Sequence, residues 1–223
     1  CIFEREELPS SRIRIVQLVP WLQKFGVEVD SIAYPGHATD WNDLLESCHR
    51  YDIVWLQKTM PGLLKSIQLR RCSNRLVFDF DDAIMMRQLA KRGSYFSPGK
   101  KLSFAGIVSQ AHGVTAGNEY LAGFVKNSKP MLIYPSPVPT DVPLKKYPNN
   151  QKGFRLGWVG LGSNLNSLNS IIPALEELST RYPIELMILS NKELLSTKLN
   201  VLNQQWTLES QEQWISQCDI GIM

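Results

Sequence analysis

Short apolar runs alternate with helical patterns along the whole chain. Such alternation is typical of βαβ units, in which helices join parallel strands and cover the sheet. Asn118 and Asp40 are expected helix N-caps, and Gly26 is an expected helix stop. The strands expected in the first part of the chain are 27–33, 52–57, 75–80, 113–116 and 131–134, and the helices are 11–25, 41–50, 61–71, 100–110 and 118–126.

A proline-rich stretch interrupts this pattern, with five prolines between residues 135 and 153. Because proline cannot donate a backbone hydrogen bond, we expect a linker at 136–153. Beyond it we expect strands at 154–159, 184–189, 199–202 and 219–223, and helices at 165–182, near Lys192 and at 209–217. The predicted fold class is therefore α/β, with two tandem Rossmann-like domains at 1–135 and 154–223. We expect the first to lack most or all of an opening strand, and the second to be truncated, because the chain stops within an apolar run.

Net charge, apolar runs and cysteine spacing limit the kinds of partner and location that the sequence suggests. The net charge of +3 and the pI of about 8.6 are too small a basic excess to indicate nucleic acid, although they suit anionic substrates or a membrane surface. No apolar run approaches the roughly 18 residues that span a bilayer. The four cysteines are widely spaced, which favours reduced thiols and a cytoplasmic location over a zinc site or a disulfide framework.

The glycine-containing turn at 157–164 links the first strand of the second domain to its first helix. Glycines there let the backbone approach a ligand closely, and N–H groups at a helix start favour phosphate. The dinucleotide fingerprint is incomplete, because Leu165 stands at the third glycine position and Ser190 stands where an acid would bind ribose. A diphosphate site is predicted at Gly160, Gly162, Ser163 and Asn164, while a plain tight turn stays open.

Three carboxylates, Asp79, Asp81 and Asp82, lie at the end of an expected strand in the first domain. Ligands in open α/β sheets bind at the carboxyl ends of strands, so these side chains are candidates for a binding cleft or for a metal site. Helix capping is the plainer alternative. A haloacid-dehalogenase-like phosphatase is disfavoured, because its aspartates follow the first strand of the domain.

Several other residues are candidates by position. Arg12 and Arg14, with Ser11 as a cap, stand at the start of the first helix and are predicted to hold an anionic acceptor. Lys58 ends a strand at the same edge as Asp81, and Trp206 is predicted to stack on a nucleobase. Solvated arginines, a surface lysine and a core tryptophan are the plainer alternatives.

Taken in order, several segments of the sequence resemble family-four glycosyltransferases of the B-type (GT-B) two-domain fold. They are 11–12, 51–58, 77–82, 114–121, 156–160, Trp206 and 218–223. The resemblance implies an acceptor-side first domain and a second domain that binds a nucleotide-diphosphate sugar. It implies sugar transfer with retention, in polysaccharide or glycoconjugate synthesis, with no metal and no cofactor beyond the nucleotide sugar as co-substrate. The implied acceptor is a glycan, a lipid-linked molecule or a small molecule, and the implied location is cytoplasmic with peripheral contact at the inner membrane face.

Carried over by position, the residues that border the donor are Gly160, Gly162, Ser163, Asn164, Ser190 and Trp206. The residues that border the acceptor are Ser11, Arg12 and Arg14. Asp81, Asp82, Lys58 and Asn118 are the cleft candidates. This sequence departs from the family at Gln57 and Lys58, where many relatives have histidine, and at His112, where relatives often have an acid. The paired glutamates and the basic phosphate-binding residues of the family would follow Met223, so we expect the chain as given to be inactive. Two rival functions stay open: a non-catalytic α/β ligand-binding module, and a metal-dependent A-type glycosyltransferase that uses Asp79 and Asp81.

Overall fold

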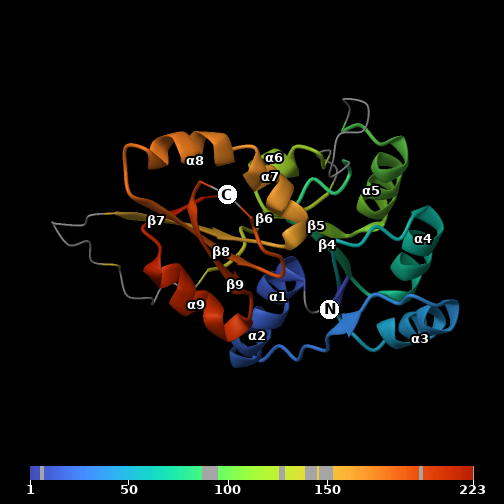
Figure 1. Ribbon diagram of the computed structural model, residues 1–223. Helices are drawn as coiled ribbons and strands as arrows, with labels where there is room; N and C mark the ends of the chain where they lie inside the picture. Colours follow the sequence, from blue (N-terminus) through green and yellow to red (C-terminus); the bar gives the residue numbers. More distant parts are fainter. Residues whose placement is uncertain are drawn as a thin grey trace. The chain divides into compact units, whose positions relative to one another are not determined.

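The computed structural model describes residues 1–5, 8–86, 95–125, 129–138, 145, 153–195 and 198–222. The chain divides into two compact units, residues 1–140 and 141–223. The strands form two separate sheets, one in each unit (Figure 1). Most of the expected linker, 139–144 and 146–152, lies outside the described residues.

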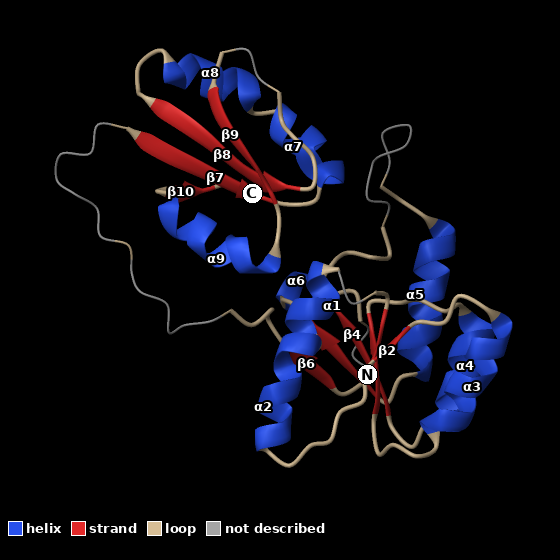
Figure 2. Cartoon of the chain, turned by 60° about the horizontal axis from the view of Figure 1, so that its bottom comes forward, coloured by secondary structure: helices blue, strands red, loops and turns tan. Residues whose placement is uncertain are grey.

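The first unit is built on a parallel sheet of six strands in the order β2-β1-β3-β4-β5-β6. Helices cover both of its faces (Figure 2). The strands are β1 (Ile2–Phe3), β2 (Ile32–Ala33), β3 (Val54–Gln57), β4 (Leu76–Phe80), β5 (Gly113–Ala116) and β6 (Met131–Ile133). The helices are α1 (Pro9–Arg14), the 3-10 turn η1 (Val16–Leu18), α2 (Val19–Lys24), α3 (Ala38–Cys48), α4 (Leu63–Cys72), α5 (Pro98–Gln110) and α6 (Glu119–Ala122).

One face of this sheet is apolar. Leu56, Phe78 and Val114 lie on neighbouring strands at paired register positions and are fully or nearly fully buried. Side chains from α3, α4 and α5, including Leu44, Leu69 and Ile107, pack in the same cluster. This hydrophobic core supplies the main driving force for folding of the first unit.

The second unit has a parallel sheet in the order β10-β7-β8-β9, formed by β7 (Phe154–Val159), β8 (Ile184–Ser190), β9 (Asn200–Gln205) and β10 (Ile220–Gly221). After the 3-10 turn η2 (Gly162–Asn164), α7 (Leu165–Asn169) and α8 (Ile172–Ser179) pack on one face, around Leu186 and Ile188. On the other face α9 (Leu208–Gln217) places Trp214 against Met187 and Leu189. The N-cap Thr207 and Ser210 form a reciprocal capping box that fixes the start of α9.

Several expected elements are corrected. The strand expected at 27–33 is reduced to the two residues of β2. The opening strand β1 has two residues, in line with the expectation that most of it is lacking. No helix occurs at Lys192 within the described residues. His37, not Asp40, is the N-cap of α3, whereas the predicted N-cap Asn118 is confirmed, since its side chain accepts from the Leu121 N–H.

Candidate functional site

The carboxyl edge of the first sheet is the first candidate site. Strand order reverses between β1 and β3, because the chain passes from β1 to β2 on one side and to β3 on the other. Ligands in open α/β sheets bind outside the carboxyl ends of strands at such a reversal. Lys58 directly follows β3, and Asp81 and Asp82 directly follow β4. The fold therefore brings three of the predicted cleft residues to one edge.

The Lys58 side chain contacts three polar groups at this edge. Its ammonium contacts the carboxylate of Asp82, lies 3.8 Å from Oδ1 of Asp81 and donates to the hydroxyl of Ser10 at 3.2 Å. Its backbone has a φ of 60°, in the left-handed region that non-glycine residues seldom adopt. The Lys58 N–H also donates to the carbonyl of Asp79 at 2.7 Å, which holds the turn against β4. The ammonium is thus positioned between two carboxylates and the start of α1.

Asp81 differs from Asp82 in its surroundings. Its side chain is 16% exposed against 64% for Asp82, and its Oδ1 atom is enclosed without a hydrogen-bond donor among the described residues. Burial raises the pKa of Asp81, and Lys58 opposes that rise. Buried polar atoms normally have a hydrogen-bond partner, so the enclosed Oδ1 atom marks Asp81 as an unusual position at this edge.

Asp81→Asn is expected to raise the free energy of unfolding at pH 7. Because burial raises the folded-state pKa of this group above 3.8, its ionisation weakens folding. The penalty develops as pH rises from the unfolded pKa through the folded one. The gain from asparagine should therefore vanish near pH 3, where the carboxyl group is largely protonated in both states (about one pH unit below its usual pKa). Urea unfolding at both pH values, with Asp82→Asn as the exposed control, tests this. Lower stability of Asp81→Asn at pH 7 would show that the attraction to Lys58 outweighs the burial cost.

A buried polar layer lies behind this edge, between α1 and the sheet. Gln57 and Asp79 occupy paired register positions, as do Asp79 and Thr115, so these three side chains share the face opposite the apolar core. Arg14 of α1 donates to both carboxylate oxygens of Asp79, Nε to Oδ2 at 2.8 Å and a terminal nitrogen to Oδ1 at 2.5 Å. Both side chains have no exposed area. The guanidinium also donates to the Tyr134 carbonyl at 2.8 Å and stacks over the Tyr134 ring.

This layer corrects two predictions for the acceptor site. Arg14 does not present its charge to a ligand in this structure, because Asp79 and Tyr134 use it internally. Ser11 is not a helix cap: it lies inside α1, is fully buried, and its hydroxyl is 3.5 Å from Oε1 of Gln57. Arg12 is half-buried on the same helix, and its acceptor role stays a prediction. Gln57 and Ser10 were not predicted as site residues, although each directly precedes one in the sequence, Lys58 and Ser11.

The second candidate site is the carboxyl edge of the second sheet. Strand order reverses there between β7 and β10. The predicted glycine turn follows β7, and Ser190 ends β8. Trp206 follows β9, and its backbone N–H donates to the Ser190 carbonyl at 3.1 Å. The fold thus brings all six predicted donor residues to the loops and strand ends of this edge.

The geometry of the glycine turn differs from a plain phosphate cradle. The Gly162 N–H donates to Oδ1 of Asn191 at 2.7 Å, and the Gly160 N–H donates to the Leu189 carbonyl at 3.2 Å. The helix expected at 165–182 is split into α7, which has five residues, and α8. A full-length helix dipole therefore does not back the turn. Ser163 and Asn164 are exposed and keep side-chain donors at the edge.

Two residues of this edge were not predicted as ligands, Asn191 and Lys192. Both follow β8, directly beside the turn that follows β7. A methyl group added at Gly162 would lie 2.5–2.7 Å from the side-chain carbons of Lys192, so the lysine stem runs directly over the turn. Trp206 is half-buried, donates from its indole to Gln211 at 3.0 Å and packs beside the Trp214 cluster. Base stacking by Trp206 stays a prediction.

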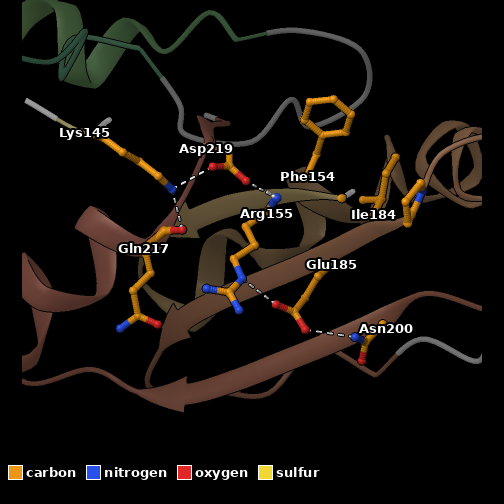
Figure 3. A pocket seen from close by; sticks show the side chains of 10 residues that line it. Lys145, Phe154, Arg155, Ile184, Glu185, Asn200, Gln217 and Asp219 are labelled. Atoms are coloured by element: carbon orange, nitrogen blue, oxygen red, sulfur yellow. Dashed lines mark hydrogen bonds and ion pairs between the residues drawn. The ribbon is translucent and has the colours of Figure 1, made fainter. Parts of the chain in front are cut away.

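A pocket of about 660 Å³ lies at the opposite, amino-terminal edge of the second sheet (Figure 3). Its charged side chains are paired with one another: Lys145 with Asp219 at 2.7 Å, and Arg155 with Glu185 at 3.0 Å. Lys145 also donates to the carbonyl groups of Gln217 and Cys218, at the carboxyl end of α9. The charges of this pocket serve to hold strand starts and the α9 terminus together. It lies away from the predicted donor site, at the other edge of the same sheet.

Two further observations concern metals and membranes. In the part of the chain that the structure describes, no group of three His, Cys, Asp or Glu side chains is arranged to hold a metal ion, and no helix is long and apolar enough to cross a membrane. Asp79, one of the two ligands of the metal-dependent rival, is buried and bound by Arg14 and Thr115. That rival is therefore corrected at this residue, since both carboxylate oxygens are bound by side chains of the protein.

The comparisons with known proteins bear on the fold. No protein-family model matches the chain, and no curated protein matches it in sequence. Among solved structures, the chain is similar to the crystal structure of MurG from Acinetobacter baumannii, with 10% identity and a TM-score of 0.50. The match covers 95% of this chain and 67% of the MurG chain. The predicted fold class, α/β with two Rossmann-like units of the GT-B type, is confirmed.

Proposed function

We propose that this protein is a glycosyltransferase that moves a sugar from a nucleotide-diphosphate sugar to an acceptor, and we retain family four, retention of configuration and glycan or glycoconjugate synthesis as parts of that proposal. One observation carries it. Each of the two Rossmann-like sheets reverses its strand order, and at each reversal the carboxyl edge gathers polar side chains. A fold with two such edges can hold two substrates.

In this proposal the second unit binds the donor. The glycine turn, Ser190 and Trp206 lie on adjacent strand ends, which suits a ligand with a phosphate part and a base part. The first unit binds the acceptor at the edge that carries Asp81 and Asp82, and Lys58 orients the two carboxylates. Catalysis then rests on positioning and on stabilising the diphosphate leaving group by fixed charges.

Turnover tests this function. The protein as its gene encodes it is incubated with UDP-, GDP-, ADP- and TDP-sugars and a mixture of glycan and lipid-linked acceptors. We expect release of one nucleoside diphosphate and a new glycoside, with unchanged rate in EDTA. Tight binding of a nucleotide sugar without any turnover would favour the non-catalytic binding module. Loss of turnover in EDTA that manganese restores would instead move the assignment to a metal-dependent transferase, with Asp81→Ala abolishing the rescue.

We also propose that the protein is cytoplasmic and makes peripheral contact with the inner face of the membrane. Leu64, Phe96 and Leu102 of the first unit are large apolar side chains with more than half of their surface exposed, and the Lys101 ammonium lies 4.6 Å from the Phe96 ring centre. Aromatic and leucine side chains flanked by lysine are typical of surfaces that bind anionic lipid. Absence of co-sedimentation with anionic vesicles would contradict this contact.

A further inference from the structure

The stem of Lys192 occupies the space that the missing side chain of Gly162 leaves. A Cβ built on Gly162 would lie 2.7 Å from Cβ, 2.5 Å from Cγ and 2.7 Å from Cδ of Lys192. The φ of Gly162 lies outside the left-handed region, so backbone conformation alone does not require glycine there. The close approach of the lysine stem is therefore the physical reason for a glycine at this position.

The loop that carries Lys192 is fixed to the edge of the sheet. Asn191 accepts from the Gly162 N–H at 2.7 Å, and the Lys192 N–H lies 3.4 Å from the hydroxyl of the buried Ser190. These contacts join the ends of β7 and β8. They hold the lysine stem in place while the residue as a whole remains exposed.

Lys192 also supplies a positive charge next to the glycine turn. The sequence between β7 and α7 and the residues between β9 and α9 contain no lysine or arginine. Lys192 forms no ion pair with any residue that the structure describes, and the neighbouring acid is Glu193, which is exposed. A diphosphate bound at the reversal between β7 and β10 would meet this ammonium at the glycine turn.

We propose that Lys192 binds the diphosphate of the donor nucleotide, with Gly162 kept free of a side chain so that the lysine can lie over the turn. This inference rests on the proposed function and assigns its donor-side cation to a residue of this chain. An ammonium recognises charge and not the base, so the contribution of Lys192 should depend on the phosphates alone. In a transfer reaction the same charge would stabilise the leaving diphosphate.

Calorimetric titrations of the full chain with UDP, GDP, uridine and guanosine test the proposal. For the nucleoside diphosphate that binds the wild type, Lys192→Ala should weaken affinity about ten- to hundredfold, the size of one lost charge-assisted hydrogen bond. Affinity for the matching nucleoside should stay unchanged, and Lys192→Arg should keep most of the diphosphate affinity. Lys198→Ala is the matched control, because that lysine precedes β9 at the amino-terminal edge of the same sheet.

The other outcomes distinguish a failure of the Lys192 role from a failure of the proposed function. Unchanged diphosphate affinity in Lys192→Ala overturns the role of Lys192 and leaves the proposed function standing. An equal loss for diphosphate and nucleoside also overturns it, because the change then acts on the shape of the site. A wild type that binds no nucleoside diphosphate overturns the inference and the donor site together. Thermal melts of each variant verify that the second unit is folded.

Discussion

Replacing Asp79 by alanine is expected to lower the free energy of unfolding of the first unit by about 3–5 kcal/mol, the usual cost of breaking a buried ion pair from one side. The pair that Asp79 forms with Arg14 is bidentate, and neither side chain has exposed area. Without the carboxylate, the guanidinium would remain between α1 and the sheet, where the described residues leave it the Tyr134 carbonyl and the Ser136 hydroxyl as acceptors. Urea unfolding followed by circular dichroism measures the change.

Two further variants give this prediction its control. Asp82→Ala removes a carboxylate that is 64% exposed, so it should cost only about 0–1 kcal/mol. Arg14→Met combined with Asp79→Leu removes both charges and should recover much of the lost stability. Equal, small losses for Asp79→Ala and Asp82→Ala would mean that water reaches the Arg14 pair and that the polar layer is not closed.

Gly162→Ala is expected to weaken binding of the nucleoside diphosphate about ten- to hundredfold, because the added methyl group must displace the stem of Lys192. Stability should fall less than binding, since the nearest atoms belong to a flexible side chain whose charged end is in solvent. The measurement is calorimetric titration of the variant alongside a denaturant melt.

The double variant Gly162→Ala with Lys192→Ala shows whether the two residues act together. If the methyl group acts by moving the lysine, the double variant should bind about as weakly as Lys192→Ala alone, because residues in contact are not additive. Additive losses would mean that Gly162 acts on the ligand directly, as in a backbone phosphate cradle. A variant that is unstable but binds normally when folded would mark Gly162 as a structural glycine.

The sequence predicted most strands well and the edge strand β2 poorly. β5 and β7 have the predicted bounds, and β4 differs by one residue. Strands inside a parallel sheet are buried on both faces, so they form continuous apolar runs that are easily recognised. The edge strand β2 is exposed and short, and the apolar residues before it in the sequence belong to no strand.

Two expected helices were wrong in length for a common reason. Pro20 stands in the first turn of α2 and Pro173 in the first turn of α8. Proline lacks the N–H that an uninterrupted helix would need at these positions, so each long helix is divided just before it. Apolar periodicity continues through the break, which is why the pattern alone did not show it.

The sequence indicated which residues lie at the strand ends but not which of their side chains bind one another. Arg14 and Asp79 are 65 residues apart, and no periodicity links them. A buried ion pair could not be distinguished from a ligand-binding arginine on sequence alone. Lys192 was missed because a helix was expected there, although its place after the strand next to the glycine turn was already visible.

Hydrogen exchange of the full chain with and without the bound nucleoside diphosphate tests most directly whether the donor binds at the carboxyl edge of the second sheet. We expect slower exchange at the carboxyl edge of the second sheet, in peptides that cover 160–164 and 190–192, with no change at 153–155 and 183–185. Slower exchange confined to the latter peptides, which line the pocket at the opposite edge, would contradict the donor site proposed for this protein.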